Sequence, residues 1–478
     1  MNVEFFLKED EQKKLMILKH LESRPDSLVK TSFLCEKLGI KPNNLQRLLI
    51  ALQNELFEYD DNPKIIREND TVTSRNVKLT HVKQLQLKYF LDSMTFLYFC
   101  DLLQGRVTPK IFGNRHFLSE GTGYIQQKNI KVFLKEHEIK VRNGRLVGSE
   151  IKIRNLFFSI LFEVFEGMCS PFPNEMEQKI DSMLKKFEES GIGELSNIQR
   201  LKFRLFLGIV IWRIQDNSFL SNEEDYFILS ERSYDNLFQQ LKKMFSITEP
   251  LVVKREMKYI LAFLQAEGVE NLSVAMTDEP FREIDRISFS IAKDILTNFH
   301  KTESNQAGDF IEALKIVNRN HIVFQYILSS FSSKAQFQYF FEAYPYFSST
   351  IETHKNQLLF GDSTVLNQLF YEYAFLVNKY FAANELEQPV HIYIEFSLGK
   401  LYTQFISDEV SCFKNMNIRV ENKLSEKTDL YLSDCMIQGL SAKSLIWKRP
   451  PTAEDWQEFG DLVIQIKQEK NNLEQLSA

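Results

Sequence analysis

A short segment near the N-terminus gathers side chains that are able to read the edges of DNA bases. Asn43, Asn44 and Gln46 carry amides that pair with adenine, and Arg47 carries a guanidinium that pairs with guanine. Lys41 adds a cation suited to a phosphate oxygen. We therefore predict that this segment binds DNA. The alternative is that these residues only form the solvated face of a helix.

The segment opens a predicted helix whose other face is apolar. Leu45, Leu48, Leu49 and Leu52 recur at helical spacing within residues 43–56, and the candidate DNA-binding residues lie off this leucine face. The core of a domain therefore holds the leucines, while the polar residues point to solvent.

The elements around this helix complete a familiar order. Helices are predicted at residues 9–22 and 30–37, and strand-like stretches at residues 65–68 and 72–79. Three helices followed by a hairpin is the order of a winged helix-turn-helix. Arg75, together with Arg67 and Lys78, is a candidate for phosphate contacts from the wing.

The same order is predicted a second time before residue 150. The expected helices are residues 82–105, 108–114 and 120–135, and the expected strands are residues 139–142 and 145–147. Asn143-Gly144 between the strands is a strong hairpin signal. A duplicated architecture is harder to dismiss than a single copy.

The second candidate recognition helix is less clearly suited to base reading. Its DNA-binding candidates are Tyr124, Gln127, Lys128 and Lys131. Gly121 and Gly123 weaken it as a helix start. The alternative is a structural copy that reads few bases.

The rest of the chain divides into a helical body and a small α/β end. Residues 152–383 have helical periodicity almost throughout, with a polar stretch near residues 267–279 that suggests two helical domains. Strand-like and helical segments alternate after residue 386. The predicted fold class is mainly α and multidomain, with five domains at residues 1–80, 81–165, 166–280, 281–385 and 386–478.

Charge is distributed unevenly along the chain. The net charge is −6, but residues 1–150 hold 24 Lys and Arg against 19 Asp and Glu, a net of +5. The remaining 34 basic and 45 acidic residues give −11. A basic head on an acidic body fits a DNA-binding end that avoids non-specific adhesion elsewhere.

Other classes of function find little support in the composition. No apolar run approaches the length of roughly 20 residues that a membrane span needs, and no signal peptide opens the chain. The five cysteines lack CxxC spacing, and the eight histidines lack HExxH or zinc-finger spacing. We expect a cytoplasmic protein with reduced thiols, no metal, no cofactor and no catalytic residues.

Taken together, these features resemble the Mga/AtxA family of global and virulence regulators of Gram-positive bacteria. The segment LCEKLGIKPNNLQRLLIALQ at residues 34–53 is similar to the family's first recognition region. GSEIKIRNLFF at residues 148–158 is similar to the glycine-x-glutamate-x-x-x-arginine ending of its second winged domain, at Gly148, Glu150 and Arg154. The order of these motifs is more specific than either one.

The resemblance implies a domain assignment. Residues 1–80 would form the first winged helix-turn-helix and residues 81–165 the second, Mga-type one. Residues 166–280 and 281–385 would be all-helical regulation domains of the phosphotransferase system (PRDs). Residues 386–478 would form a domain similar to the phosphotransferase protein EIIB and contribute to a homodimer.

The sequence departs from the family pattern in two places that bear on regulation. The first PRD-like region has no histidine, so the candidates for phosphorylation by a phosphocarrier are His300, His321 and His354 in the second. The loop after the first strand of the EIIB-like domain reads Ser397-Leu398-Gly399-Lys400 and lacks a thiol. The resemblance therefore implies an EIIB-like domain without catalytic activity.

The leading prediction is a transcription regulator, not an enzyme, that binds double-stranded DNA as a homodimer. A preference for curved or A·T-rich DNA would follow from deformability. A PRD-type RNA-binding antiterminator is the alternative, although such proteins begin with a β-rich RNA-binding module. A sugar phosphotransferase component is a third reading, against which the missing loop cysteine argues.

Overall fold

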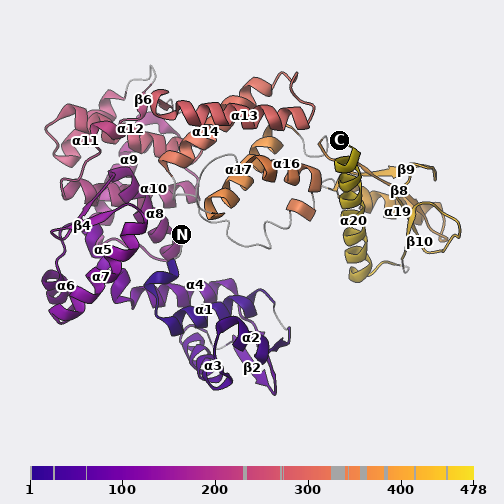
Figure 1. The fold of residues 1–478 in the computed structure, drawn as a ribbon, viewed down its shortest axis with the longest axis horizontal. Coiled ribbons are helices and arrows are strands. Elements are labelled where there is room, and N and C mark those ends of the chain that lie inside the picture. The colour runs from indigo at the N-terminus through magenta and orange to yellow at the C-terminus, as the bar shows by residue number, and fades with distance from the viewer. Residues whose placement is uncertain are drawn as a thin grey trace. The chain divides into compact units, whose positions relative to one another are not determined.

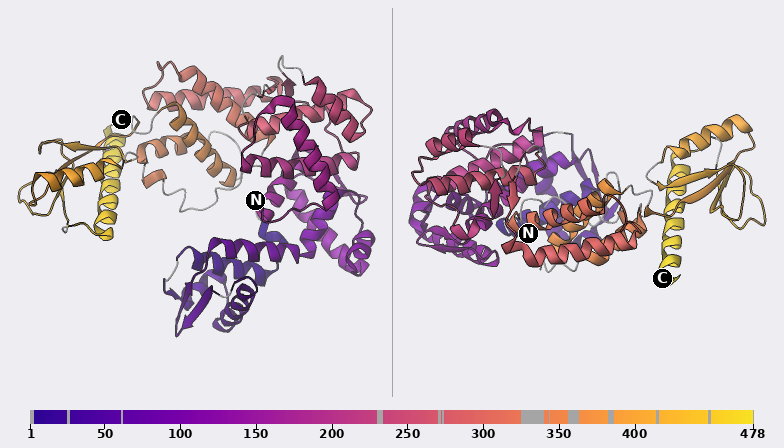
Figure 2. Two further views of the ribbon diagram at one scale, coloured as in Figure 1. Left: turned by 180° about the vertical axis from the view of Figure 1, so that it is seen from behind. Right: turned by 90° about the horizontal axis from the view of Figure 1, so that it is seen from above.

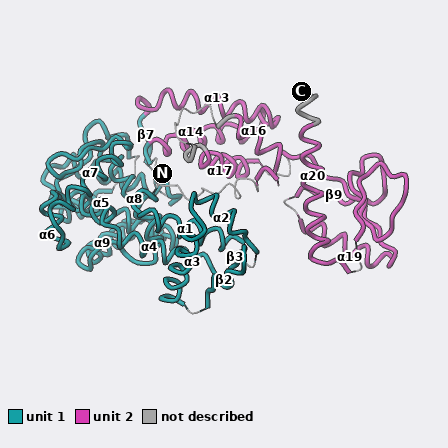
Figure 3. Tube along the Cα trace, turned by 60° about the horizontal axis from the view of Figure 1, so that its bottom comes forward, with its two compact units in different colours: residues 1–277, 323–327 teal, residues 278–322, 328–478 magenta. Residues whose placement is uncertain are grey.

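The computed structural model describes residues 3–24, 27–60, 62–229, 234–269, 272, 274–324, 340–342, 344–355, 363–381, 386–413, 416–447 and 450–477. Within these residues the chain is mainly helical, with a small parallel sheet near the C-terminus, as predicted (Figure 1). The chain forms two compact units (Figure 3). The first contains residues 1–277 and 323–327, and the second contains residues 278–322 and 328–478.

The first 75 residues have the element order expected for a winged helix-turn-helix. The elements are η1 (Val3–Phe6), α1 (Glu9–Glu22), β1 (Val29–Lys30), α2 (Thr31–Leu38), α3 (Pro42–Phe57), β2 (Lys64–Glu68) and β3 (Thr71–Arg75). The leucine face predicted for α3 is buried. The second strand was expected to reach residue 79, but it ends at Arg75 because Asn76 turns to a φ of 58°.

The next 72 residues repeat this architecture with one more helix than predicted. The elements are α4 (Leu79–Leu91), α5 (Met94–Gln104), α6 (Pro109–His116), α7 (Glu120–Glu136), β4 (Lys140–Arg142) and β5 (Arg145–Val147). The single helix expected at residues 82–105 is wrong, because α4 ends at Leu91 and Ser93 begins a new helix. Ser93 caps α5 by accepting a hydrogen bond from the Phe96 N–H. The hairpin at Asn143-Gly144 is confirmed by positive φ at both residues.

The two helix-turn-helix turns have the same length and backbone shape. Residues 39–41 separate α2 from α3, and residues 117–119 separate α6 from α7. Each turn begins with a left-handed residue, Gly39 at φ 62° and Phe117 at φ 56°. The Phe117 ring is 97% exposed. Two turns of one geometry support an internal repeat.

A glycine in the second winged unit allows α6 and α7 to pack closely. A Cβ at Gly123 on α7 would lie 2.4 Å from the Pro109 carbonyl oxygen of α6. Gly121, two residues earlier, has no non-neighbouring atom nearer than 3.7 Å. The first-turn glycines were expected to weaken this helix, yet α7 begins at Glu120 with Ser119 as its cap. Gly123 is therefore required by the helix crossing.

The helical region that follows contains one feature that contradicts the all-helical prediction. Its helices are α8 (Glu150–Phe165), α9 (Asn174–Phe187), η2 (Glu188–Ile192), α10 (Asn197–Gln215), η3 (Asn222–Glu224), α11 (Asp235–Phe245) and α12 (Pro250–Ala266). A two-stranded antiparallel sheet, β6 (Phe227–Leu229) with β7 (Val274–Met276), lies among them. Three residues per strand are too few for a periodicity signal, so the sequence pattern could not reveal the pair.

Four buried charges join α8 to the helices after it. Glu150 accepts hydrogen bonds from Nε of Arg154 at 2.9 Å and from Nη2 of Arg213 at 2.8 Å. Glu256 of α12 accepts from Nη1 of Arg154 at 2.6 Å. Burial opposes the charge on Arg154, but Glu256 and Glu150 outweigh it and raise the pKa of the guanidinium. Two cations and two anions balance, so no buried charge is left uncompensated.

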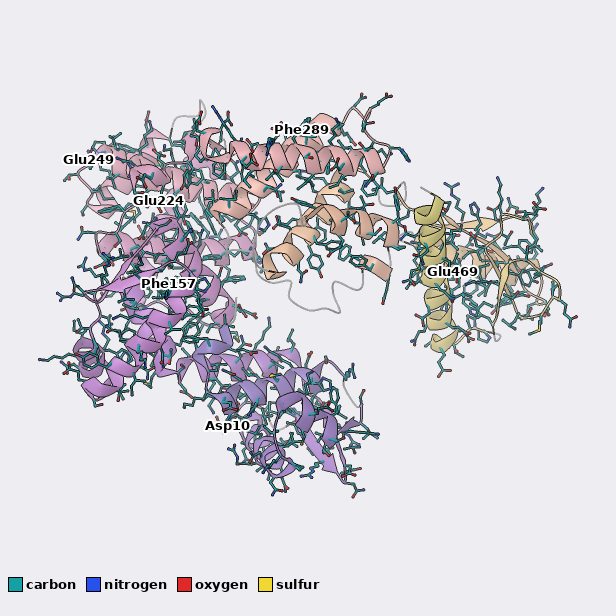
Figure 4. The ribbon with its side chains drawn as sticks, viewed as in Figure 1. Asp10, Phe157, Glu224, Glu249, Phe289 and Glu469 are labelled. Carbon is teal, nitrogen blue, oxygen red and sulfur yellow. The ribbon has the colours of Figure 1, made fainter. Side chains whose placement is uncertain are left out.

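A second interaction fixes the N-terminus of α8. Glu224, labelled in Figure 4, accepts hydrogen bonds from the Ser149 hydroxyl at 2.6 Å and from the Ile151 N–H at 3.1 Å. Burial alone would raise the pKa of Glu224, but these bonds and the one from Ser221 lower it. Its negative charge therefore stands at the positive end of the helix.

Residues from far along the chain complete the aromatic core of the first unit. The Phe324 ring lies 5.8 Å from Tyr259 and 6.2 Å from Phe263. The Val323 carbonyl accepts a hydrogen bond from the side chain of Asn155 on α8 at 2.5 Å. Val323 is also the last residue of α14. The end of this helix therefore belongs to the first compact unit, while the rest of the helix belongs to the second.

The second unit begins with another helical region. Its described helices are η4 (Glu279–Phe281), α13 (Arg282–Asn298), α14 (Ala307–Val323), α16 (Pro345–Lys355) and α17 (Ser363–Tyr380). Their core gathers aromatic and branched side chains, among them Ile291, Phe310, Phe370 and Tyr373. The helical periodicity predicted for residues 152–383 extends over residues 325–339, 343, 356–362 and 382–383, which lie outside the described residues.

The C-terminal residues form a parallel sheet with helices. The elements are β8 (Val390–Glu395), α19 (Lys400–Ser411), β9 (Ile418–Glu421), β10 (Leu430–Ser433), β11 (Lys443–Ile446) and α20 (Ala453–Ser477). The strand order is β11-β10-β8-β9, and all the pairs are parallel. The long helix α20 runs beside this sheet in both views of Figure 2. Phe413, just after α19, lies 6.1 Å from Phe459 of α20, so the two helices meet over one face.

Among the described residues, no helix combines the length and hydropathy that a membrane crossing requires.

The glycine at the α6–α7 crossing gives a direct test of this packing. We expect Gly123→Ala to lower the free energy of unfolding, because the new methyl group would overlap the Pro109 carbonyl. Gly121→Ala is the matched control and should be neutral or stabilising by up to about 1 kcal/mol, since alanine favours helix. Urea denaturation followed by circular dichroism measures both. Equal effects at the two positions would contradict the close crossing.

Candidate nucleic-acid interface

The outer face of α3 presents a continuous stripe of exposed side chains. Asn43, Arg47, Ile50 and Asn54 follow one another at intervals of three or four residues, and all four are exposed. The side chain of Ile50 is 55% exposed at the centre of the stripe. Ile50 and Asn54 were not predicted, although continuing the helical spacing from Arg47 would have found them. An apolar side chain here suits the methyl group of thymine.

The remaining predicted DNA-binding residues of the first winged unit lie near the start of α3. Lys41 is the residue before the helix, and Asn44 and Gln46 follow in its first turns, all exposed. Backbone N–H groups at a helix N-terminus also attract phosphate. The predicted residues therefore do lie together on one exposed end of the helix.

Arg47 is held by an acidic residue of α1. Its Nη2 atom donates to both carboxylate oxygens of Asp10, at 3.0 and 2.9 Å. Figure 4 labels Asp10 in this first region. More than half of each side chain is exposed, so the pair contributes only about 0.2–1 kcal/mol. A DNA phosphate or guanine edge could displace the carboxylate at this cost.

The first wing concentrates positive charge at its base and not at its tip. Lys64 and Arg75 are direct cross-strand partners, and both are exposed. Like charges directly opposite one another are destabilising unless an anion lies between them. The tip carries Glu68 and Asp70 instead. Arg75 is thus placed for a phosphate contact, with Lys64 as a partner that was not predicted.

Three of the four predicted residues on α7 share an exposed face. Tyr124, Lys128 and Lys131 are spaced by four and three residues and point outward. Gln127 lies on the inner side, where its amide donates to the Tyr98 hydroxyl at 3.1 Å. Gln127 therefore helps to hold α7 on α5.

Counting both recognition helices from their first residue brings out how they differ. Leu52 and Leu56 of α3 correspond to Ile130 and Leu134 of α7, and all four are buried. The outward positions of α3 that hold Asn43, Gln46, Arg47, Ile50 and Asn54 correspond in α7 to Gly121, Tyr124, Ile125, Lys128 and Val132. At these corresponding positions, α7 thus lacks the amides and the guanidinium that α3 presents.

The second wing also carries an opposed basic pair. Arg142 and Arg145 are cross-strand partners that flank the turn. Arg145 is paired with Asp216 at 3.2 Å, whereas the Arg142 side chain is exposed. Arg142 was not predicted, but its place beside the Asn143-Gly144 turn was a usable signal.

Positive charges gather near α2 in the first winged unit. Burial lowers the pKa of His20, and the charges of Lys37 and Arg24 lower it further. Positive neighbours that disfavour a protonated histidine would also attract a phosphate backbone.

The three candidate regulatory histidines occupy different environments. His300 is exposed just after α13, with a φ of 53°. His321 is 2% exposed, and its Nε2 atom lies 2.8 Å from a Glu372 carboxylate oxygen. His354 belongs to α16, but its side chain lies outside the described residues.

The loop after β8 is closed by a carboxylate. The Ser397 N–H and hydroxyl donate to the two oxygens of Asp434, at 2.9 and 2.7 Å. An acidic side chain thus occupies the backbone donor at the end of this strand. In the described part of the chain, no cluster of three or more His, Cys, Asp or Glu side chains could hold a metal ion.

Comparison with protein families identifies the second winged unit. Residues 79–162 match the family model of the Mga helix-turn-helix domain. The match spans α4 to α8 and confirms the resemblance to Mga-family regulators for this part of the chain. The chain is accordingly a DNA-binding transcriptional regulator. No curated protein matches it.

The pairing of Arg47 with Asp10 predicts the effect of an acidic residue on DNA binding. We expect Asp10→Asn to increase affinity for duplex DNA by up to about fivefold, because Arg47 no longer has to leave a carboxylate. Glu9→Gln is the matched control, because it removes the same charge from α1 but Glu9 pairs with Lys13 and not with Arg47. Fluorescence anisotropy at fixed salt compares the two. An equal gain from Glu9→Gln would mean that net charge alone is responsible.

Proposed function

We propose that this DNA-binding regulator of the Mga type reads base edges with α3 and holds the DNA backbone with α7 and the two wings. The observation that carries the proposal is the exposed stripe of α3, in which amides, a guanidinium and an aliphatic side chain alternate along one face. Asn43 and Asn54 suit adenine, Arg47 suits guanine and Ile50 suits thymine.

The same proposal assigns α7 a supporting role. Lys128 and Lys131 are cations on its outer face, and Tyr124 adds a hydroxyl that is able to donate to a phosphate oxygen. Lys64, Arg75 and Arg142 would add contacts from the wings. Such contacts raise affinity for any sequence and depend strongly on salt.

Selection from a random duplex library tests the division of labour between the helices. We expect Arg47→Ala to lose roughly ten- to hundredfold affinity for the selected sequence, since a bidentate guanine contact contributes about 1–3 kcal/mol. Lys128→Ala should weaken all duplexes alike and reduce the salt slope by about one.

The controls decide between DNA reading and its alternatives. If Arg47→Ala selects the same sequence with the same affinity, α3 is not the reader. If the wild type prefers an RNA hairpin to duplex DNA at every salt concentration, the RNA-binding antiterminator replaces the present proposal. Lys423 is an exposed lysine in the acidic part of the chain after residue 150, and it serves as a control. Lys423→Ala should change neither the affinity for DNA nor the salt slope.

We also propose that the chain acts as a homodimer through its C-terminal domain. Five large apolar side chains are exposed around two adjacent loops of the parallel sheet, and we call them the sheet-end patch: Leu398, Leu401, Phe405, Met436 and Ile437. The bond between Ser397 and Asp434 joins these loops. Leu401 is 89% and Met436 78% exposed, and large apolar side chains left exposed in this way favour association.

Light scattering after size exclusion tests the dimer. We expect Leu401→Glu to shift the protein from twice the chain mass towards 56.2 kDa, because a carboxylate in the sheet-end patch would be desolvated in the interface. Leu424→Glu makes the same change outside the patch and should remain dimeric. A wild type that is monomeric at micromolar concentration would contradict the proposal, as would a dimeric Leu401→Glu.

The finer division of the chain and its regulation are proposals that rest on the resemblance. They comprise the five domains, with PRD-like regions at residues 166–280 and 281–385 and an EIIB-like region at residues 386–478. They also comprise a link to the carbohydrate phosphotransferase system, a role in global or virulence gene control, and a preference for curved or A·T-rich DNA. His300 is favoured as an acceptor of phosphate by its exposure, and His321 by its carboxylate partner.

A further inference from the structure

A cavity of about 200 Å³ lies where α8 ends and the helical region begins. Its walls come from the last turns of α8, the loop at residues 166–172, Glu177 of α9 and the facing side of α10. Most of the wall is apolar, from Leu161, Phe162, Phe165, Phe172 and Leu205. The cavity is separate from the DNA-facing helices α3 and α7, and neither of these contributes to its lining.

The walls of the cavity are held in place before any ligand arrives. A Cβ at Gly208 on α10 would lie 2.2 Å from the Phe172 ring, so this glycine lets the ring rest against the helix backbone. The ring of Trp212 packs against the same ring, with the two ring centroids 4.7 Å apart. Gly167 has a φ of 81° and lies against Leu201. Preformed apolar walls of this kind are typical of small-molecule sites.

One end of the cavity is polar and carries negative charge. The Glu177 carboxylate accepts a hydrogen bond from the Ser170 hydroxyl and pairs with Arg204, which also pairs with Asp181. Arg204 is thus paired with two carboxylates, Glu177 in the cavity lining and Asp181 outside it, so its positive charge is already balanced before a ligand arrives. A hydroxyl hydrogen would be attracted here, while a second carboxylate would be repelled.

We propose that this cavity binds a small neutral molecule with one aromatic ring and a hydroxyl group, a ligand of the phenol class. An apolar cavity of about 150 Å³ is large enough for benzene. The ring would lie between Phe162 and Phe172, with its hydroxyl directed to Glu177. The mouth of the site carries Cys169, whose thiol is exposed.

The cavity shares residues and an ion pair with the segment that matches the Mga helix-turn-helix domain. Leu161 and Phe162 belong both to the cavity wall and to the segment that matches the Mga helix-turn-helix domain. Glu166, on the rim, pairs with Lys83 of α4 in that domain. The ligand site stands independently of how the DNA is read, because its evidence and its test involve no DNA.

Calorimetric titration of the full chain with p-cresol tests the site. We expect saturable binding with a dissociation constant of about 0.1–1 mM, as suits so small a ligand. The anion p-toluate keeps the methyl-substituted ring but carries a carboxylate in place of the hydroxyl. It should bind at least about tenfold more weakly, because that carboxylate meets the acidic end. Absence of saturable p-cresol binding, or equal binding of both compounds, would overturn the proposal.

Two further measurements locate the ligand. Alkylation of Cys169 by iodoacetamide should slow when p-cresol is bound, while Cys412, which is exposed elsewhere, should react at an unchanged rate. Leu205→Phe should fill the cavity and remove p-cresol binding, and Leu251→Phe makes the same change at an exposed site. Because Leu205→Phe could perturb folding, its circular dichroism is compared first. Unprotected Cys169 with saturable binding would place the ligand elsewhere and refute the site.

Discussion

The fixed position of α8 depends on the four buried charges of Glu150, Arg154, Arg213 and Glu256. Removing one partner from such a network leaves a buried charge uncompensated, which costs about 3–5 kcal/mol. Glu150 and Arg154 are motif residues at the end of the second winged unit, yet they face the protein interior. Their pattern marks a joint and not a site of DNA contact. Glu224 and the α8 N-terminus complete that joint, so the winged unit cannot turn freely on the helices that follow.

The two winged units can therefore serve different purposes within one compact unit of the chain. The buried positions of α3 and α7 match, because both helices must pack on the same kind of three-helix core. Their outward positions are free of that constraint and have diverged. The close α6–α7 crossing adds a further cost to variation at Gly123, whereas α3 has Leu45 at the corresponding position. In the second winged unit, the close packing of α6 on α7 is therefore the main restriction on which residues α7 can carry.

The sequence predicted features that repeat locally and missed those that depend on distant partners. Helical periodicity located α1, α3 and α7 closely, and Asn143-Gly144 located a hairpin. The strands β1, β6 and β7 have two or three residues each, and only their pairing over long separations defines them. The contact of Arg47 with Asp10 joins residues 37 positions apart, which no local pattern encodes. The inward turn of Gln127 depends likewise on Tyr98 of a different helix.

The end of α14 has a consequence for how the protein could be divided. Phe324 fills a place among Phe227, Tyr259 and Phe263, and Val323 satisfies the amide of Asn155. A chain truncated after residue 277 would lose both, leaving an aromatic void and an unpaired buried amide in the core beside α8. The DNA-binding half is therefore not a self-sufficient module. Its core is complete only after the segment near residue 324 has been synthesised.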